Sequence, residues 1–110
     1  MPQAPMGLLQ GTLDVLILRA LVRGPRHGYA VSRWVRERTG GALQIEDAPL
    51  YKALRRLEAA GCVIAEWGAS ESNRRARYYR LTAAGRTRLR SDESAWRRYV
   101  AAVAAVLKPS

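Results

Sequence analysis

The sequence predicts a mainly α-helical fold with one small β-hairpin and a long C-terminal helix. Two segments with strand composition, residues 62–67 and 75–81, flank a polar turn, and a heptad repeat runs through residues 82–107. We therefore expect an N-terminal domain over residues 1–81 and a dimerisation helix within residues 82–110. Before the strands, apolar residues recur at helical spacing in three segments: residues 12–22, 27–39 and 47–61.

Residues 47–61 are expected to form a helix with two different faces. Asp47 is predicted to cap its start and Gly61 to end it. One stripe is typical of a helix packed on a core: Leu50, Ala53, Leu54, Leu57 and Ala60. The other side carries the residues predicted to contact DNA: Ala48, Pro49, Tyr51, Lys52, Arg55 and Arg56. A basic face can be merely solvated, but the small side chains on this one leave Tyr51, Lys52 and Arg55 projecting.

The segments before this helix complete a helix-turn-helix. Residues 1–11 are expected to form a loose arm in which Leu8 and Leu9 can pack. A helix then begins at Thr12 and ends at the sequence Arg-Gly-Pro over residues 23–25. A helix over residues 27–39 and a short β-like segment over residues 42–45 follow. Two helices joined by a short linker, the second of them basic, are the elements of a helix-turn-helix.

The first helix carries more apolar surface than one core requires. One stripe faces the expected core: Leu13, Leu16, Ile17, Ala20 and Leu21. Val15, Leu18 and Val22 form a second stripe, which we expect to pack on a second subunit.

Residues 62–81 are predicted to form a basic β-hairpin. Its second strand alternates, so Tyr79 and Leu81 lie on one face and Tyr78 on the other. The arginines expected at the hairpin tip are Arg74, Arg75 and Arg77. Because it directly follows a basic helix, this hairpin is interpreted as a DNA-binding wing. An ordinary hairpin with solvated arginines is the alternative.

The last helix is expected to begin after Thr82 and to continue to about Leu107. Its heptad pattern predicts intersubunit contacts through Leu89, Trp96, Tyr99, Val103 and Val106, and Asp92 interrupts the apolar line. Trp96 could instead cover a planar aromatic ligand, with Asp92 one turn away favouring a cationic one. The alternative is that Trp96 only packs in the dimer.

Composition limits the function. The chain has 110 residues, with 19 Lys and Arg against 9 Asp and Glu, a net charge of +10 that favours a polyanionic partner. With one histidine and one cysteine it offers no metal-ligand set and no nucleophile, base and acid combination, so we expect no cofactor, no metal and no enzymatic activity. It lacks a membrane-spanning run and a signal peptide, which predicts a cytoplasmic protein without membrane contact.

Four blocks of the sequence follow one another in a fixed order: LLQGTLDVLILRAL, HGYAV, LYKALRRLEAAG and RRARYYRLTAAG. Together they resemble the PadR family of winged-helix transcriptional regulators, and within it the subfamily with a short C-terminal helix. The resemblance implies a homodimer that represses promoters, with a DNA-reading helix at residues 47–61, a wing at 62–81 and a dimerising helix at 82–107. It also allows a flat aromatic inducer at the dimer centre. Pro49 and Lys52 depart from residues frequent in the family, so the operator sequence does not transfer.

Three functions fit these features. The prediction is a sequence-specific regulator of transcription, a repressor that binds a dyad-symmetric operator in double-stranded DNA as a homodimer. The alternatives are a basic protein-interaction adaptor and a nonspecific architectural DNA-binding protein. Only the first should prefer a promoter over bulk duplex at physiological salt.

Overall fold

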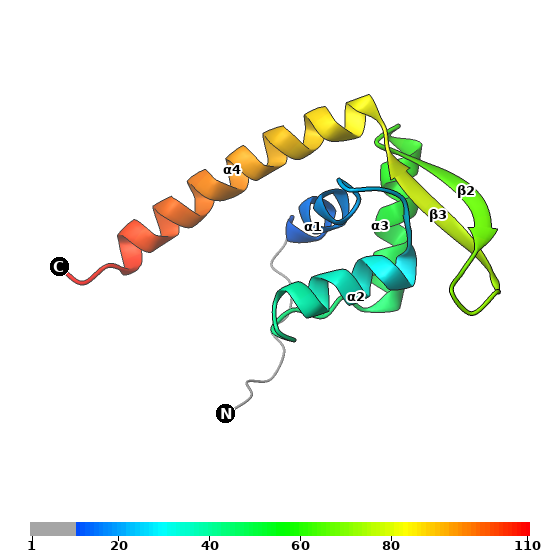
Figure 1. Ribbon diagram of the computed structural model, residues 1–110. Coiled ribbons are helices and arrows are strands. Elements are labelled where there is room, and N and C mark those ends of the chain that lie inside the picture. The colour runs from blue at the N-terminus through cyan, green and yellow to red at the C-terminus, as the bar shows by residue number, and fades with distance from the viewer. Residues whose placement is uncertain (1–10) are drawn as a thin grey trace.

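The computed structural model describes residues 11–110 as a three-helix body, a β-sheet and a long last helix (Figure 1). The mainly helical fold class with a small wing is confirmed. The expected arm with Leu8 and Leu9 lies outside the described residues. In chain order the elements are α1 (Thr12–Ala20), β1 (Arg26–His27), α2 (Gly28–Arg38), α3 (Asp47–Ala59), β2 (Val63–Ala69), β3 (Arg75–Leu81) and α4 (Ala83–Leu107).

The core lies where α1, α2 and α3 meet the sheet and the start of α4. The predicted inner stripe of α3 is confirmed except for Ala60, which is exposed because α3 ends just before it. Tyr79 and Leu81 of β3 close one side of the core, as the alternation predicted. The largest fully buried side chains are Ile17, Leu18, Leu21, Val31, Val35, Leu50, Leu54, Leu57 and Val63.

The second apolar stripe of α1 is covered by α4 of the same chain. Leu18 is 0% exposed, and Leu89 of α4 and Val15 are also buried in the single-chain core. Val22 is partly buried and packs against the same cluster. The prediction that Leu18 and Leu89 contact a second subunit is therefore wrong, because the first turns of α4 cross α1 and remove both side chains from the surface.

The ends of the helices differ from the predicted ones in two places. Asp47 is the first residue of α3 and not its cap, since Glu46 holds the cap position, although the Glu46 side chain makes no capping hydrogen bond. The Asp47 carboxylate still lies near the positive end of the helix dipole. The α1 helix ends at Ala20, before the predicted Arg-Gly-Pro stop.

Two other predicted ends are confirmed. Gly61 has a φ of 77° and terminates α3, with the Cys62 N–H donating to the Leu57 carbonyl at 2.9 Å. Thr82 caps α4, because its hydroxyl accepts from the Gly85 N–H at 3.0 Å. The same hydroxyl donates to the Gly61 carbonyl at 2.6 Å, which fastens the start of α4 to the end of α3.

The sheet is antiparallel with strand order β1-β3-β2. The short strand β1 was not expected, whereas the β-like segment at residues 42–45 has only a single bridge residue, Leu43. Strand β2 extends to Ala69, beyond its predicted end, and pairs Trp67 with Arg77.

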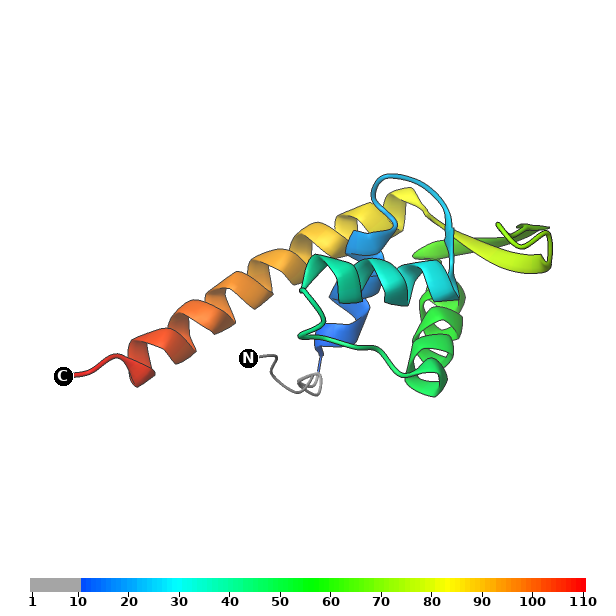
Figure 2. The ribbon, with the colours of Figure 1, turned by 60° about the horizontal axis from the view of Figure 1, so that its bottom comes forward.

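In two views the hairpin and the C-terminal half of α4 project from opposite sides of the helical body (Figures 1 and 2). The expected domain division after Leu81 coincides with the junction of β3 and α4, although Leu89 beyond it belongs to the core. Within residues 11–110, no helix is both long enough and apolar enough to span a membrane.

Candidate DNA-binding surface

The outer face of α3 presents basic side chains that have no acidic partner. Lys52 and Arg55 are exposed, and within residues 11–110 neither forms a salt bridge. Ala48 and Pro49 are also exposed, at the start of the helix. Because those two side chains are small and Lys52 and Arg55 are long, this face can approach an anionic surface closely.

Tyr51 shares this face but is held by the neighbouring helix. It is 40% exposed, and its ring lies so close to Gly28 that a Cβ at that position would be 2.8 Å from it. Burial, together with the nearby charge of Asp47, raises the pKa of the Tyr51 hydroxyl. The hydroxyl therefore stays protonated at neutral pH and can donate a hydrogen bond to a phosphate or a base.

Arg56 is held apart from Lys52 and Arg55 by a salt bridge to Asp14 of α1. The same carboxylate, only 14% exposed, also accepts from Arg88 of α4 at 2.8 Å. Asp14 thus joins α3, α1 and α4 at one point. What this side of α3 presents is an ion pair and not a free guanidinium.

The hairpin arginines have three different environments. Arg74 is exposed in the turn, and the guanidinium of Arg75 lies over the Trp67 ring at 4.4 Å. Arg77 was predicted at the hairpin tip, but it lies further along β3. There its guanidinium donates a hydrogen bond to the Glu58 carboxylate of α3 at 2.9 Å. Arg75 and Arg77 share the face of the hairpin that turns toward α3, because their positions on β3 alternate with outward-facing ones.

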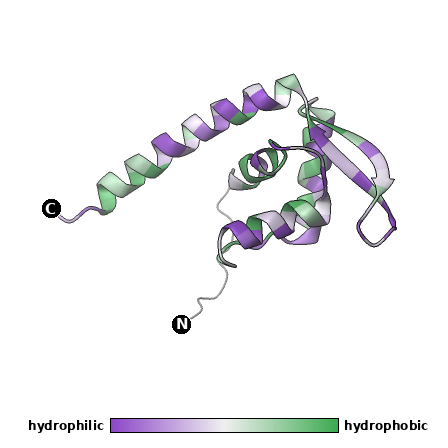
Figure 3. Ribbon diagram, in the orientation of Figure 1, coloured by the Kyte–Doolittle hydropathy of each residue, from purple (hydrophilic) through white to green (hydrophobic). Residues whose placement is uncertain are grey.

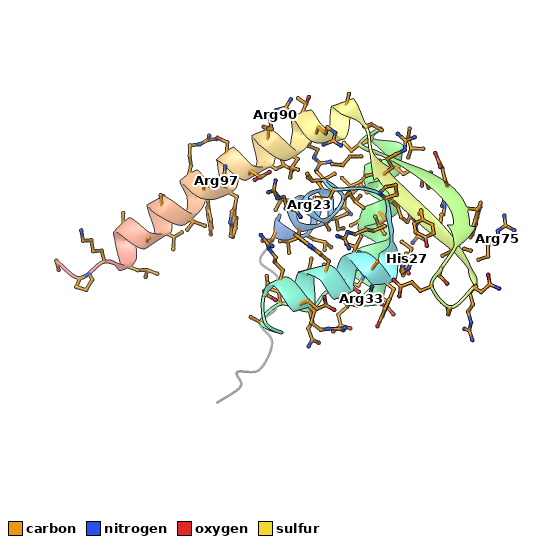
Figure 4. All side chains as sticks on the ribbon, viewed as in Figure 1. Arg23, His27, Arg33, Arg75, Arg90 and Arg97 are labelled. Atoms are coloured by element: carbon orange, nitrogen blue, oxygen red, sulfur yellow. The ribbon has the colours of Figure 1, made fainter. Side chains whose placement is uncertain are left out.

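A cleft of about 690 Å³ separates the wing from the helices. One wall is lined by His27 together with Tyr29 and Arg33 of α2, and the other by Trp67 and Arg75. Figure 4 shows His27 and Arg33 on the helical side and Arg75 on the wing. Sequence reasoning missed Tyr29, Arg33 and Trp67 as members of this site, since they come from two elements far apart in the chain. The signal available was that Tyr29 and Trp67 are large aromatic residues in a strongly basic chain.

His27 fixes the position of the first wall. Its Nδ1 accepts a hydrogen bond from the Ala30 N–H at 3.1 Å and so caps α2. Across the cleft, the guanidinium of Arg33 lies 3.4 Å from the Glu71 carboxylate in the hairpin turn. This exposed contact ties the tip of the wing loosely to α2.

The apolar side chains of the outer half of α4 are exposed, although its inner end is buried. Val106 is 82% and Leu107 76% exposed, and Figure 3 shows this end of α4 as hydrophobic. At helical spacing the exposed apolar side chains form one strip: Trp96, Tyr99, Val100, Val103, Val106 and Leu107. We call this set the α4 strip.

A cavity of about 680 Å³ lies between α1 and α4, at the inner end of the α4 strip. It brings together the predicted pair Trp96 and Asp92, and the Trp96 and Tyr99 rings stack at 6.0 Å. Asp14 and Arg88 also line it, which the sequence did not indicate.

Arg88 stays charged in this cavity. Burial lowers the pKa of its guanidinium, but a hydrogen bond with the Cys62 side chain and the carboxylates of Asp14 and Asp92 together raise it. In this cavity the carboxylates of Asp14 and Asp92 face the guanidinium of Arg88, and Arg56 outside the lining also pairs with Asp14.

A helix-turn-helix with a cationic outer helix and a basic hairpin beside it defines a winged-helix DNA-binding protein. The model of the transcriptional regulator PadR-like family matches residues 17–91. The chain belongs to the PadR-like family of transcriptional regulators. It is thus a DNA-binding regulator of transcription, and the family and its structural neighbours are regulators and not enzymes.

Solved structures with the same fold cover nearly the whole chain. A transcriptional regulator from Clostridium thermocellum is 29% identical with a TM-score of 0.82, over 90% of this chain and 96% of that one. A PadR family transcriptional regulator from Eggerthella lenta is 34% identical with a TM-score of 0.76, over 92% of this chain and 86% of that one. A protein from Lysinibacillus sphaericus is 33% identical over 89 residues, which is 81% of this chain and 82% of the relative.

Proposed function

We propose that the protein is a transcriptional repressor that binds a dyad-symmetric operator as a homodimer. One observation carries the proposal. In Figures 1 and 3, α3 and the wing lie toward one end of the molecule, and the outer half of α4, which carries the α4 strip, projects from the other end. DNA and a second subunit can therefore be bound at the same time.

In the complex, α3 lies in the major groove. Lys52 and Arg55 reach base edges, Tyr51 donates to the sugar-phosphate backbone, and Ala48 and Pro49 allow the start of the helix to approach closely. Arg74 and Arg75 of the wing grip phosphates or an adjacent narrow minor groove. The role of Arg56 is mainly structural, because its salt bridge to Asp14 joins α3 to α1.

Dimerisation is proposed to use the α4 strip. Apolar side chains as exposed as Val106 and Leu107 on a projecting helix are unfavourable in water unless a partner covers them. A second copy of the same helix offers a matching apolar surface, and Trp96, Tyr99 and Val103 then form the centre of the interface. Two α3 helices related by the dyad would face successive major grooves about 34 Å apart.

Selection of bound sequences from a random DNA pool tests the proposed function. A dyad motif with half-sites one helical turn apart is the expected result. Lys52→Ala and Arg55→Ala should each flatten the preference at particular positions of each half-site, because one contact to a base edge contributes about 1–3 kcal/mol of discrimination. Arg90→Ala, on the exposed side of α4, is the control and should leave the motif intact.

Two results of the selection would count against a dyad operator. No enrichment at all would favour the protein-interaction adaptor or the nonspecific architectural DNA-binding protein. An enriched motif that both α3 variants keep unchanged would show that another surface reads the bases.

The double variant Arg74→Ala/Arg75→Ala should bind DNA of every sequence more weakly, and by the same factor. Removing one arginine–phosphate contact reduces the slope of log affinity against log salt by roughly 0.9, so the slope of the double variant should fall by about 1.8. Gel-shift titrations at several salt concentrations measure this slope. Arg80→Ala is the matched control, because Arg80 is on the other face of β3 and pairs with Glu66 at 3.3 Å. An unchanged slope in the double variant would mean that the wing does not touch DNA.

The cavity between α1 and α4 is the proposed inducer site. Trp96 and Tyr99 offer stacked aromatic surface, and Asp92 one turn before Trp96 offers negative charge, so the fitting ligand is planar, aromatic and cationic. Such a ligand relieves repression only if it binds the DNA-incompetent arrangement more tightly, since equal affinity shifts nothing.

Planar dyes of opposite charge test the inducer site. A cationic dye should bind and weaken operator binding, and an anionic dye of similar shape should do neither. Trp96→Leu should weaken dye binding at least about fivefold, because an aromatic contact contributes about 1 kcal/mol, and Trp67→Leu on the wing should not. Dye fluorescence polarisation gives the affinities. If no dye releases the operator, the protein is controlled by its abundance and not by a ligand.

A further inference from the structure

The end of α1, the loop after it and α2 enclose a second cationic site. We propose that this site binds a phosphate group, which goes beyond the proposed function. It is a cavity of about 120 Å³ lined by Arg19, Ala20, Val22, Arg23, Arg26, Trp34 and Arg38. We call it the arginine cavity.

Two of its guanidinium groups are held in place by the fold. The Arg26 Nε donates to the Ala20 carbonyl at 2.8 Å, at the free end of α1. The guanidinium carbons of Arg26 and Arg38 lie 5.8 Å and 5.6 Å from the centre of the Trp34 ring. Trp34 and the end of α1 therefore restrict both side chains before any ligand binds, which lowers the entropy cost of binding.

The positive charge of the arginine cavity is largely unneutralised within the described chain. Four arginines line it, and its lining among residues 11–110 contains no acidic residue. Within residues 11–110, only Arg19 of the four has a carboxylate partner, Glu93 at 3.7 Å. Several other arginines of the described chain are paired with acids, as Arg77 is with Glu58. Like charges held together repel each other, and an anion between them would turn repulsion into attraction.

The shape and chemistry of the site favour a phosphate group over other anions. The volume is a few times the roughly 30 Å³ that a water molecule occupies in the liquid, which suits one tetrahedral oxyanion. A guanidinium presents a planar fork of N–H groups that matches two phosphate oxygens. A phosphate has oxygens for more than one such fork, whereas a carboxylate has only two oxygens in all.

The arginine cavity is separate from the DNA-reading surface. Among the residues that the structure describes, it shares no lining residue with the cleft beside the wing. On α2, Trp34 and Arg38 are one turn apart on one stripe, and Tyr29 and Arg33 form another that faces the cleft. Figure 4 places Arg23 well away from Arg75 on the wing. A phosphorylated small molecule could therefore reach the site, and a backbone phosphate of DNA that extends past α3 is the second source of the same group.

Titration of the full chain with inorganic phosphate tests the proposal without any operator DNA. Chloride salt keeps the ionic strength constant as phosphate is added. Under these conditions we expect a saturable shift of the Trp34 indole N–H signal in a nuclear magnetic resonance spectrum. Arg26→Gln/Arg38→Gln should weaken phosphate binding at least tenfold, and Arg38→Gln alone, at an exposed position, should weaken it without disturbing the fold. Arg90→Gln/Arg98→Gln removes the same charge from α4 and should change nothing.

The proposal of a phosphate site would be overturned if the Trp34 signal of the wild type moved linearly with phosphate concentration and did not saturate. It would also be overturned if the Arg26→Gln/Arg38→Gln variant bound phosphate with the affinity of the wild type. A second titration uses protein saturated with a selected DNA duplex. Phosphate that still binds identifies a small-molecule site. If the bound DNA excludes inorganic phosphate, the occupant is a backbone phosphate of the DNA. In that case the slope of log DNA affinity against log salt should also fall by about 1.8 in the Arg26→Gln/Arg38→Gln variant. Because the first titration needs only the free protein, its failure is distinguishable from failure of the proposed repressor function.

Discussion

Val103→Glu/Val106→Glu is expected to convert the proposed dimer into a folded monomer and to weaken operator binding by about 10²–10⁴-fold. The substitutions place two carboxylates in the outer half of the α4 strip, where the partner helix would bury them unpaired. The monomer itself should fold normally, because both side chains are exposed in the single chain and the core ends near Leu89. The operator affinity falls because two half-sites are no longer bound by one linked molecule.

Analytical ultracentrifugation measures the mass, circular dichroism the helix content, and a gel shift the operator affinity of this variant. Ala101→Glu is the matched control, since Ala101 is exposed on the other side of α4 from Val103. We expect it to remain dimeric with operator affinity near that of wild type. A Val103→Glu/Val106→Glu protein that is still a dimer would assign dimerisation to a different surface.

Gly85→Ala is expected to destabilise the whole domain by about 3 kcal/mol or more. In an ordinary exposed helix position this change would stabilise the protein by about 1 kcal/mol, so the expected sign is reversed. A Cβ at Gly85 would lie 2.1 Å from the Cys62 carbonyl oxygen and 3.0 Å from Leu81 Cδ2. Because the first atom is backbone, α4 must move away from the end of α3. That movement breaks the bond from the Thr82 N–H to the same carbonyl, now 3.1 Å long.

Urea unfolding followed by circular dichroism measures the free energy of unfolding for this variant. Ala84→Gly is the control, one position earlier and exposed, where we expect only the usual loss of about 1 kcal/mol for glycine in a helix. A Gly85→Ala protein as stable as wild type would show that α4 and α3 are less tightly joined than the distances indicate.

Local patterns in the sequence were sufficient to predict the elements and the inward faces of most of them. The stripe of α3 from Leu50 to Leu57, the alternation of β3 and the ends at Thr82 and Gly61 all follow from local periods and backbone preferences. The basic outer face of α3 followed in the same way. These features depend on neighbours a few residues away, which the sequence contains directly.

The packing of the elements, in contrast, settles which element covers each face and which charges meet. The second stripe of α1 required a partner, but its period could not distinguish α4 of the same chain from a second subunit. Arg56 and Arg77 looked like free cations in the sequence, whereas Asp14 and Glu58 lie beside them in the fold. Conversely, the arginine cavity arises because residues from α1, the following loop and α2 converge with no acidic residue in its described lining. Periodicity gives the direction of a side chain on its own element, whereas its partner across space is set by how the elements pack.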